Sequence, residues 1–419
     1  MKLGFDGLMK FVRGTTFNPA ALPIGLALLA LVAWVPTFLE LRSTSSDQVA
    51  ESFGIATACQ AGRFLLGWIG EVAPPAANLS WTDWVPAKAV PWLSCQLALH
   101  SPLNPAQSFL LLGLSLTFAL ALVACRRAGF LPNTSLVVAF VITTAPCSFS
   151  RIGHLSLSML WPIIPGLLAC HGLWRAMQAQ RIGWPVLGTG VLAGLLCYPA
   201  QDYYIVFLIL QILACFGLLL FLATTRTIEL ASLGRIAGSG ALFVLGFVVV
   251  MVWAESPNLL TSAAGGPPGS WVMPRSANEQ FLYGLLPFTW LIPPPWVEAV
   301  NQAFVQAGVS TGTESYWRSS GSLLIPIAWL VSLWQLARRR SSPESPDGET
   351  SSVAFFALLL GLITFLGLFC MTMGGMGTLF AVVVSPVLRS LNRYTVFVYG
   401  ASVLVLASLL DASLRRRVR

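Results

Sequence analysis

Charged residues are scarce in this sequence. Asp, Glu, Lys and Arg make up 10% of its 419 residues, whereas hydrophobic residues make up 56%. A typical soluble domain carries about 25% charged residues, because its surface must face water. The shortage of charge excludes an ordinary soluble enzyme and predicts a protein whose solvent is lipid.

Motifs of nucleotide-driven pumps and zinc proteases are also missing, because the chain has no P-loop and no HExxH. The eight cysteines are scattered and form no CxxC. Cys59 and Cys95 share one predicted outer segment, where they either form a disulfide in an oxidising compartment or stay as free thiols. The others lie in or beside apolar runs and are interpreted as small packing residues: Cys125, Cys147, Cys170, Cys197, Cys215 and Cys370.

Long apolar runs recur along the whole chain. A helix needs about 20 apolar residues to cross the hydrocarbon of a bilayer, and it satisfies its own backbone hydrogen bonds there. We therefore predict an all-α integral membrane protein, a single transmembrane domain over residues 1–419 with about ten spans. The predicted spans cover residues 20–39, 106–124, 131–147, 155–173, 184–197, 204–223, 236–253, 323–336, 353–371 and 394–410.

Lysine and arginine are distributed unevenly about these spans. If the N-terminus is cytoplasmic, every short segment assigned to the cytoplasm is basic, as the positive-inside rule requires. Both termini are then cytoplasmic, and we expect a bacterial inner-membrane protein. The pI of about 9.3 reflects this topology and gives no evidence for nucleic-acid binding. The cytoplasmic basic residues are Lys2, Lys10, Arg13, Arg126, Arg127, Arg175, Arg181, Arg226, Arg235, Arg338, Arg339, Arg340, Arg415, Arg416, Arg417 and Arg419.

Two predicted periplasmic loops are far longer than helix connections need to be. They cover residues 40–105 and 255–321, whereas such connections usually take about 2 to 8 residues. Trp favours the headgroup level, so we expect these loops to carry short amphipathic helices on the membrane surface. The polar cytoplasmic segment 338–352 is typical of a flexible linker. The loop tryptophans are Trp68, Trp81, Trp84, Trp92, Trp271, Trp290, Trp296 and Trp317.

No predicted span carries Asp, Glu, Lys or Arg near its centre, although proton- and ion-coupled transporters generally need such residues. Ionisable side chains gather instead near the predicted outer ends of the spans. This pattern predicts a polar cavity at the outer membrane face. The residues are Asp47, Glu51, Asp83, Asp202, Glu255 and Glu279 on the acidic side, with Arg151, His154, Arg389 and Arg393 on the basic side.

Four stretches of the sequence combine apolar residues with characteristic polar ones. They are RIGHLSLSMLWPIIP (151–165), YPAQDYYIVF (198–207), ANEQFLYGLLPFTWLIP (277–293) and MGGMGTLFAVVVSPVLRSLNRYTVFV (373–398). These stretches resemble a family of bacterial polytopic membrane proteins described as glycosyltransferase-like or phosphoglycerol-transferase-like. Their order and spacing agree with the family over nearly the whole chain, and the resemblance implies a GT-C fold. One position departs from the family, because Asp47 follows Ser46 where glycine is frequent.

The resemblance implies a particular reaction. A GT-C enzyme moves a sugar from a polyprenyl-phosphate donor to a hydroxyl of a glycan or lipid-linked acceptor at the outer face, with inversion at the anomeric carbon. A carboxylate must take the proton of that hydroxyl. Asp47 is the first candidate for this base and Asp83 the second. The alternatives are a helix N-cap for Asp47 and a solvated loop residue for Asp83.

The departing lipid phosphate gains negative charge, which guanidinium groups neutralise through bidentate hydrogen bonds. Arg389 and Arg393 lie four apart, on one face of a helix that enters the last span. Arg151 and His154 lie three apart and are assigned to the same phosphate. The alternatives are arginines that extend toward the headgroups without a substrate, and a structural hydrogen bond for His154.

The remaining assignments concern sugars, metals and rival functions. Tyr203, Tyr204, Glu279 and Tyr283 are assigned to the sugar and acceptor, against the alternative that the tyrosines belong to an interfacial aromatic belt. A divalent metal, Mg²⁺ or Mn²⁺, held by Asp47 and another carboxylate is compatible with this class, although no ligand spacing demands it. A lipid or solute transporter, which predicts inverted repeats with broken helices, and a non-catalytic membrane subunit stay open as alternatives. Pro162 and Pro165 interrupt one predicted span, 155–173, but the sequence shows no inverted-repeat pairing.

Overall fold

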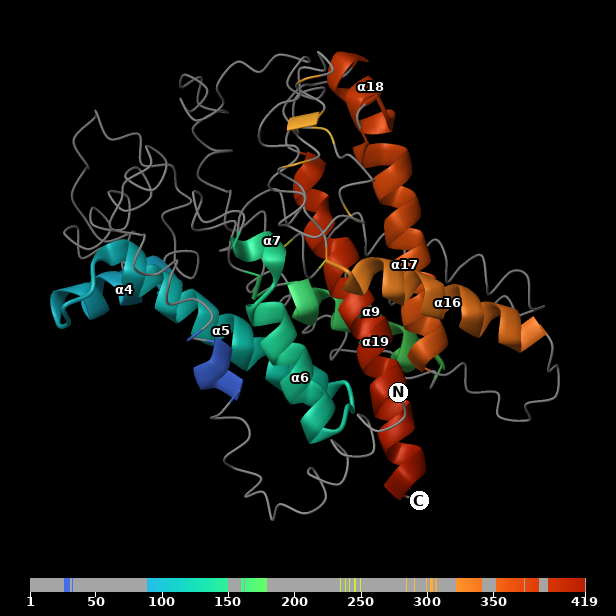
Figure 1. Cartoon of the computed structure of the whole chain (residues 1–419), viewed down its shortest axis with the longest axis horizontal. Coiled ribbons are helices and arrows are strands. Elements are labelled where there is room, and N and C mark those ends of the chain that lie inside the picture. Colours follow the sequence, from blue (N-terminus) through green and yellow to red (C-terminus); the bar gives the residue numbers. More distant parts are fainter. Residues whose placement is uncertain are drawn as a thin grey trace.

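The computed structural model describes residues 26–30, 32, 89–149, 160–161, 163–178, 322–340, 352–372, 374–383 and 391–418, with isolated positions from 234 to 306. Most of these residues are helical and none lies in a β-strand, which confirms the all-α class for this part of the chain. The helices are α4 (Ala89–Leu99), α5 (Pro105–Arg127), α6 (Pro132–Thr143), α7 (Pro146–Phe149), α9 (Ile163–Gln178), α16 (Leu324–Arg340), α17 (Ser352–Leu366), the π-helix η3 (Gly367–Met371), α18 (Met376–Val383), the 3₁₀ helix η4 (Leu391–Tyr394) and α19 (Thr395–Val418) (Figure 1).

Among the described residues, 3 helices are long and apolar enough to cross a membrane. Each has 20 or 22 residues and overlaps a predicted span. A helix of 20 residues extends over about 30 Å, the thickness of the hydrocarbon layer. The remaining predicted spans are shorter as described helices or lie wholly or partly outside the described residues. The three helical segments are Ala106–Arg127, Ser352–Met371 and Thr395–Arg416.

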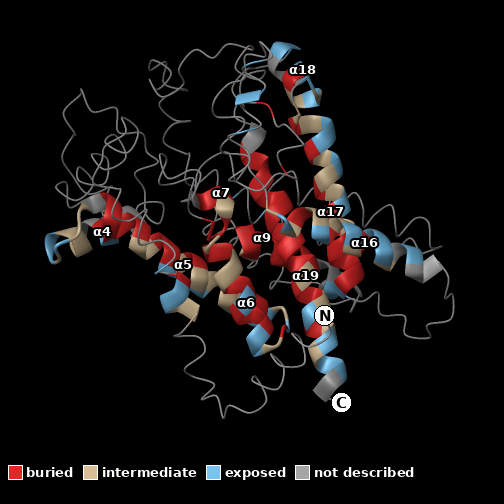
Figure 2. Ribbon diagram, viewed as in Figure 1, coloured by how far each residue is buried: buried red, intermediate tan, exposed pale blue. Residues whose placement is uncertain are grey.

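Helix α19 is the centre of the described helices. It contacts α6, α9, α16 and α17, and Figure 2 shows buried residues along much of its length. Its sequence is apolar on every face from Thr395 to Leu410, which is typical of a helix enclosed by others. Its fully buried residues include Val396, Phe397, Val398, Ala401, Leu404 and Val405.

Helices α6 and α19 run antiparallel. The N–H of Leu131, directly before α6, donates to Asp411 near the C-terminal end of α19 at 2.7 Å. The hydroxyl of Tyr399, near the start of α19, donates to the carbonyl of Val141 near the end of α6 at 3.0 Å. Two hydrogen bonds at opposite ends therefore hold the pair in register.

A glycine allows α9 to lie close against α19. A Cβ atom at Gly400 would lie 3.0 Å from Cγ2 of Ile163 and 3.0 Å from Cδ1 of Leu167. Such contacts are tighter than ordinary van der Waals distances, so a larger residue would push the two helices apart.

Two predicted spans are interrupted at proline. The run predicted as one span over 131–147 forms α6 and α7, with the break directly before Pro146. In the run predicted over 155–173, α9 begins at Ile163, directly after Pro162, and the two residues before that proline are not helical. Proline lacks an N–H and disfavours the helical conformation in the residue before it. The prediction of an uninterrupted span is therefore wrong over 131–147, whereas the predicted interruption of the span over 155–173 at Pro162 agrees with the start of α9.

The first predicted outer loop contains α4, which packs on α5. Its side chains do not form the expected polar face. Leu93 and Leu99 are exposed while Ser94 is buried, and Ser94 and Gln96 point about 200° apart around the axis. The prediction of an amphipathic helix is wrong for α4, whose sequence is apolar on most sides.

The predicted cytoplasmic linker is shorter than the segment 338–352. Helix α16 continues through Arg340, and α17 begins at Ser352. Arginines in the last turn of a helix interact favourably with its dipole, which is consistent with the longer α16. Residues 341–351 lie outside the described residues.

Three of the predicted packing cysteines are confirmed as buried. Cys125, Cys147 and Cys170 are free thiols in the core, whereas Cys370 is partly exposed. Cys197, Cys215 and Cys59 lie outside the described residues, as does the side chain of Cys95.

Candidate functional site

Arg393 is the one predicted site residue within the part of the chain that the structure describes. It lies in η4, directly before α19, and is 6% exposed. The convergence of the predicted residues in one cavity therefore stays a prediction. The other candidates lie outside the described residues: Asp47, Asp83, Arg151, His154, Tyr203, Tyr204, Glu279, Tyr283 and Arg389.

The backbone at Arg393 differs from the expected α-helix. Residues Leu391–Tyr394 form a 3₁₀ helix, and α19 begins only at Thr395. A 3₁₀ helix has about 3 residues per turn, so positions four apart point about 120° away from each other. The α-helical register assumed for Arg389 and Arg393 therefore does not hold at Arg393.

The burial of Arg393 distinguishes between its two sequence interpretations. An arginine that extends toward the headgroups keeps its charged end in water, whereas Arg393 is 6% exposed. Burying a guanidinium is costly unless neighbouring groups compensate its charge, and Arg393 does interact with its surroundings. Its environment thus argues against a purely interfacial role.

The two residues that follow Arg393 are anchored to other helices. The buried Tyr394 hydroxyl donates to the carbonyl of Ile363 in α17 at 2.9 Å. The hydroxyl of Thr395 accepts from Nε1 of Trp290 at 3.2 Å. Both contacts lie in the core, so the backbone next to Arg393 is held rigidly.

Trp290 lies in the helical core, although the sequence analysis placed the loop tryptophans at the membrane surface. Its side chain is fully buried and packs edge-on against Trp329 in α16, with ring centroids 5.8 Å apart. Nε1 of Trp329 donates in turn to the hydroxyl of Thr364 at 3.2 Å. An indole can be buried where its N–H finds an acceptor, and Thr395 supplies one for Trp290. The predicted surface position is wrong for this residue.

Trp290, Trp329 and Tyr394 form an aromatic cluster, and Gly367 allows this cluster to pack closely against α17. A Cβ atom there would lie 2.8 Å from Cη2 of Trp290 and 3.1 Å from Cε1 of Tyr394. Gly367 is also the first residue of the π-helix η3. π-Helical turns are frequent at functional sites. The contact of Gly367 with Tyr394, the residue after Arg393, therefore makes the surroundings of Arg393 a suitable candidate for a functional site.

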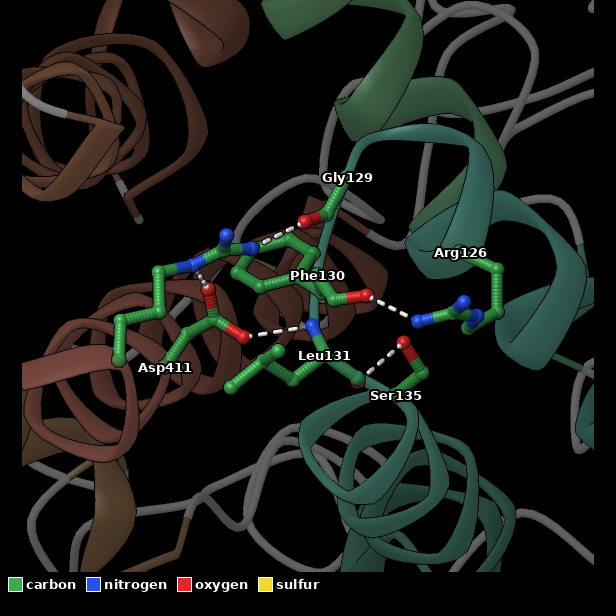
Figure 3. Close-up of polar contacts among 7 residues, drawn as sticks. Arg126, Gly129, Phe130, Leu131, Ser135 and Asp411 are labelled. Atoms are coloured by element: carbon green, nitrogen blue, oxygen red, sulfur yellow. Dashed lines mark hydrogen bonds and ion pairs between the residues drawn. The ribbon is translucent and has the colours of Figure 1, made fainter. Parts of the chain in front are cut away.

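A second polar arrangement lies at the other end of α19. Oδ1 of Asp411 accepts the N–H of Leu131, and its Oδ2 accepts from Nε of Arg415, both at 2.7 Å. Nη2 of Arg415 donates to the carbonyl of Gly129. The turn between α5 and α6 is thus bound to α19 by a buried carboxylate and a half-exposed arginine (Figure 3).

Arginines from three helices meet at this turn. Nη1 of Arg126 donates to the carbonyl of Phe130 at 2.7 Å, and Figure 3 shows Arg126 and Asp411 on opposite sides of the turn. Gly129 has φ 92°, and a Cβ atom there would lie 3.7 Å from Nη1 of Arg175. We name two groups together the basic cluster: the three arginines that contact or approach this turn, Arg126, Arg175 and Arg415, and the exposed Arg127, which follows Arg126 in α5.

From the sequence, these arginines were expected only to set the topology, and Asp411 was not among the predicted site residues. A signal was present, because Asp411 and Arg415 are four apart and so pair on one helical face. The contact with Leu131 has no such signal, since it joins distant parts of the chain.

No group of three or more His, Cys, Asp or Glu residues in the described ranges could hold a metal ion. The proposed metal ligand Asp47 lies outside those ranges.

The described part of the chain is mostly α-helical and contains apolar helices long enough to cross a membrane. No protein-family model, curated relative or solved structure matches the chain.

Proposed function

We propose that the chain is a membrane glycosyltransferase of the GT-C type. It would transfer a sugar from a polyprenyl-phosphate donor to a hydroxyl of a glycan or lipid-linked acceptor, at the periplasmic face of a bacterial inner membrane. The burial of Arg393 beside the first turn of α19 carries the proposal. A guanidinium is an expensive group to keep from water, and binding a phosphate is a function that repays this cost.

In the proposed reaction, the acceptor oxygen attacks the anomeric carbon while Asp47 or Asp83 takes the hydroxyl proton. The bond between the anomeric carbon and the donor's phosphate oxygen breaks on the opposite side, so the configuration inverts. The lipid phosphate leaves with the bonding electrons, and Arg389 and Arg393 neutralise its charge. Arg151 and His154 assist at the phosphate, while Tyr203, Tyr204, Glu279 and Tyr283 bind the sugar and the acceptor.

The anchoring of Tyr394 and Thr395 supports the role of Arg393. Electrostatic stabilisation of a leaving group depends on charges that are already in place before the reaction. Hydrogen bonds from Tyr394 to Ile363 and from Trp290 to Thr395 hold the adjoining backbone. Arg393 therefore starts from a rigid backbone.

A transporter would favour helices broken at mid-depth that are paired by inverted repeats. One predicted span agrees with a broken helix, because α9 begins only at Ile163, near the middle of the span over 155–173. A second break follows the helical segment Ser352–Met371, at a turn with φ 76° at Gly374 before α18. Since 20 residues extend over about 30 Å, this second break is expected where the hydrocarbon ends. A single mid-span break in the described residues gives the transporter little support.

A transfer assay in detergent with radiolabelled polyprenyl-phosphate sugars tests the proposal. Arg393→Gln is expected to lower turnover about 10² to 10³-fold, as for the loss of one stabilising donor. Arg393→Lys is expected to recover part of it, because lysine keeps the charge and loses the bidentate geometry. Arg338→Gln, at the C-terminal end of α16, is the matched control and should turn over normally.

The same assay with Asp47→Asn and Asp83→Asn identifies the base. The variant that lacks the base should still bind the donor but should not transfer the sugar. Normal turnover in both Asn variants would show that neither Asp47 nor Asp83 is the base. Full activity in Arg393→Gln would show that Arg393 does not stabilise the departing lipid phosphate. Uptake of labelled substrate into liposomes without any transfer would favour the transporter instead.

A further inference from the structure

An exposed apolar strip on α5 leads to the basic cluster. Ser115, Ala119, Val123 and Arg127 recur every four residues, so they lie along one face of the helix, and all four are exposed. The hydroxyl of Ser115 donates to the carbonyl of Leu111 at 2.8 Å, so its polarity is satisfied within the helix. The strip is therefore a narrow surface of small side chains that ends at arginine.

We propose that this face binds one anionic phospholipid, with its phosphate on the basic cluster and an acyl chain along the strip. The site is separate from Arg393, because it lies at the other end of α19.

The arginines of the cluster are positioned by the turn that they surround. Arg126 donates to the carbonyl of Phe130, and Arg415 donates to the carbonyl of Gly129 and to Asp411. A guanidinium has five N–H donors, so each keeps further donors for phosphate oxygens. The side chain of Arg415 is 48% exposed, which leaves it accessible to a headgroup.

The charge of the cluster favours an anionic headgroup over a zwitterionic one. Within the described residues Asp411 pairs with one of these four arginines, Arg415, and it also accepts the N–H of Leu131. A net positive charge therefore faces outward. A phosphatidylglycerol headgroup complements it, whereas the ammonium of phosphatidylcholine adds a repelling charge.

The depth of the cluster also fits a lipid phosphate. The candidate span Ala106–Arg127 ends within the cluster, and the phosphates of a bilayer lie directly beyond the hydrocarbon. A single arginine at a helix end interacts with headgroups in general. Here guanidinium groups from α5, α9 and α19 share one turn, which is the arrangement of a defined site.

Native mass spectrometry of the purified full chain, titrated with phosphatidylglycerol or phosphatidylcholine, tests this site. We expect one phosphatidylglycerol to bind more tightly than phosphatidylcholine. The double variant R127Q/R175Q removes two charges and should weaken phosphatidylglycerol binding roughly tenfold or more. The matched control R338Q/R339Q removes the same charge from the end of α16 and should bind as the wild type does.

The strip is tested by Ala119→Trp, which obstructs the acyl path without changing charge. It should weaken phosphatidylglycerol binding severalfold, whereas Leu330→Trp at an exposed position of α16 should not. If R127Q/R175Q does not fold, this pair alone decides the question. If each variant loses as much affinity for phosphatidylglycerol as its control does, the proposed site is wrong. Competition by glycerol 3-phosphate as effective as by the lipid would overturn the role of the strip.

Discussion

Asp411 caps helix α6 from a distant part of the sequence. Its Oδ1 accepts the N–H of Leu131 at 2.7 Å across 280 residues. Leu131 is the N-cap residue of α6, and its own side chain makes no capping bond. A carboxylate at a helix N-terminus satisfies a free N–H and interacts favourably with the helix dipole. One side chain thus fastens α6 to α19 and pairs with Arg415.

Replacing this carboxylate should destabilise the helical core. Asp411→Ala leaves the N–H of Leu131 without its acceptor and Arg415 without its ion pair, at a cost of about 1 to 3 kcal/mol. Asp411→Asn keeps one acceptor oxygen and should lose less. Denaturant unfolding in detergent measures both, with Ser413→Ala as the control at an exposed site on α19. An Asp411→Ala variant as stable as this control would show that the cap contributes nothing.

Two glycines in one segment should respond oppositely to alanine. At Gly367 a Cβ atom meets Trp290 at 2.8 Å and Tyr394 at 3.1 Å, so Gly367→Ala should destabilise by about 1 to 3 kcal/mol. At Gly361 nothing lies within 4 Å of the added Cβ. Gly361→Ala should therefore be neutral or stabilising by up to about 1 kcal/mol, because alanine favours helix.

Unfolding midpoints of the two glycine variants, measured side by side, check this contrast. Tryptophan fluorescence is a suitable second readout, because the added methyl group at Gly367 displaces the Trp290 ring. Similar midpoints for both variants would mean that the aromatic cluster does not close against α17 as described.

The hydrogen bond between Trp290 and Thr395 should contribute measurably to stability. Thr395→Val keeps the shape and leaves the buried indole N–H without its acceptor, at a cost of about 1 to 3 kcal/mol. Thr364→Val, at the partly buried bond from Trp329, is a matched comparison and should cost less. A double-mutant cycle with Trp290→Phe should give a coupling energy of about 0.5 to 1.5 kcal/mol. If the destabilisation by the two substitutions is strictly additive, the hydrogen bond between Trp290 and Thr395 is excluded.

Long apolar runs predicted helices, because lipid leaves helix as the economical conformation. The segments Ala106–Arg127, Ser352–Met371 and Thr395–Arg416 agree with those predictions. The interruption before Ile163 was predicted from Pro162, whereas the break before Pro146 was missed because only the length of that apolar run was considered. The local effect of proline on helices therefore corrects the span boundaries that the length of an apolar run predicts.

Contacts between distant segments could not be read in the same way. Composition favours the membrane surface for tryptophan, and only the packing of Gly367 and Thr395 explains why Trp290 is buried. The cap from Asp411 to Leu131 likewise depends on which helices become neighbours. Of the candidate site, the sequence predicted Arg393, whereas its burial and its 3₁₀ turn depend on the fold.

The predicted topology puts the two ends of the described helices on opposite sides of the membrane. Met376 in α18 should face the periplasm and Ser413 in α19 the cytoplasm, and both are exposed. In a background without reactive cysteines, Met376→Cys should react with an impermeant maleimide in intact spheroplasts. Ser413→Cys should react only after the membrane is opened, because the arginine-rich end of α19 is retained inside. The reverse labelling pattern would invert the topology, and it would move Arg393 away from the periplasmic face that the proposed transfer reaction requires.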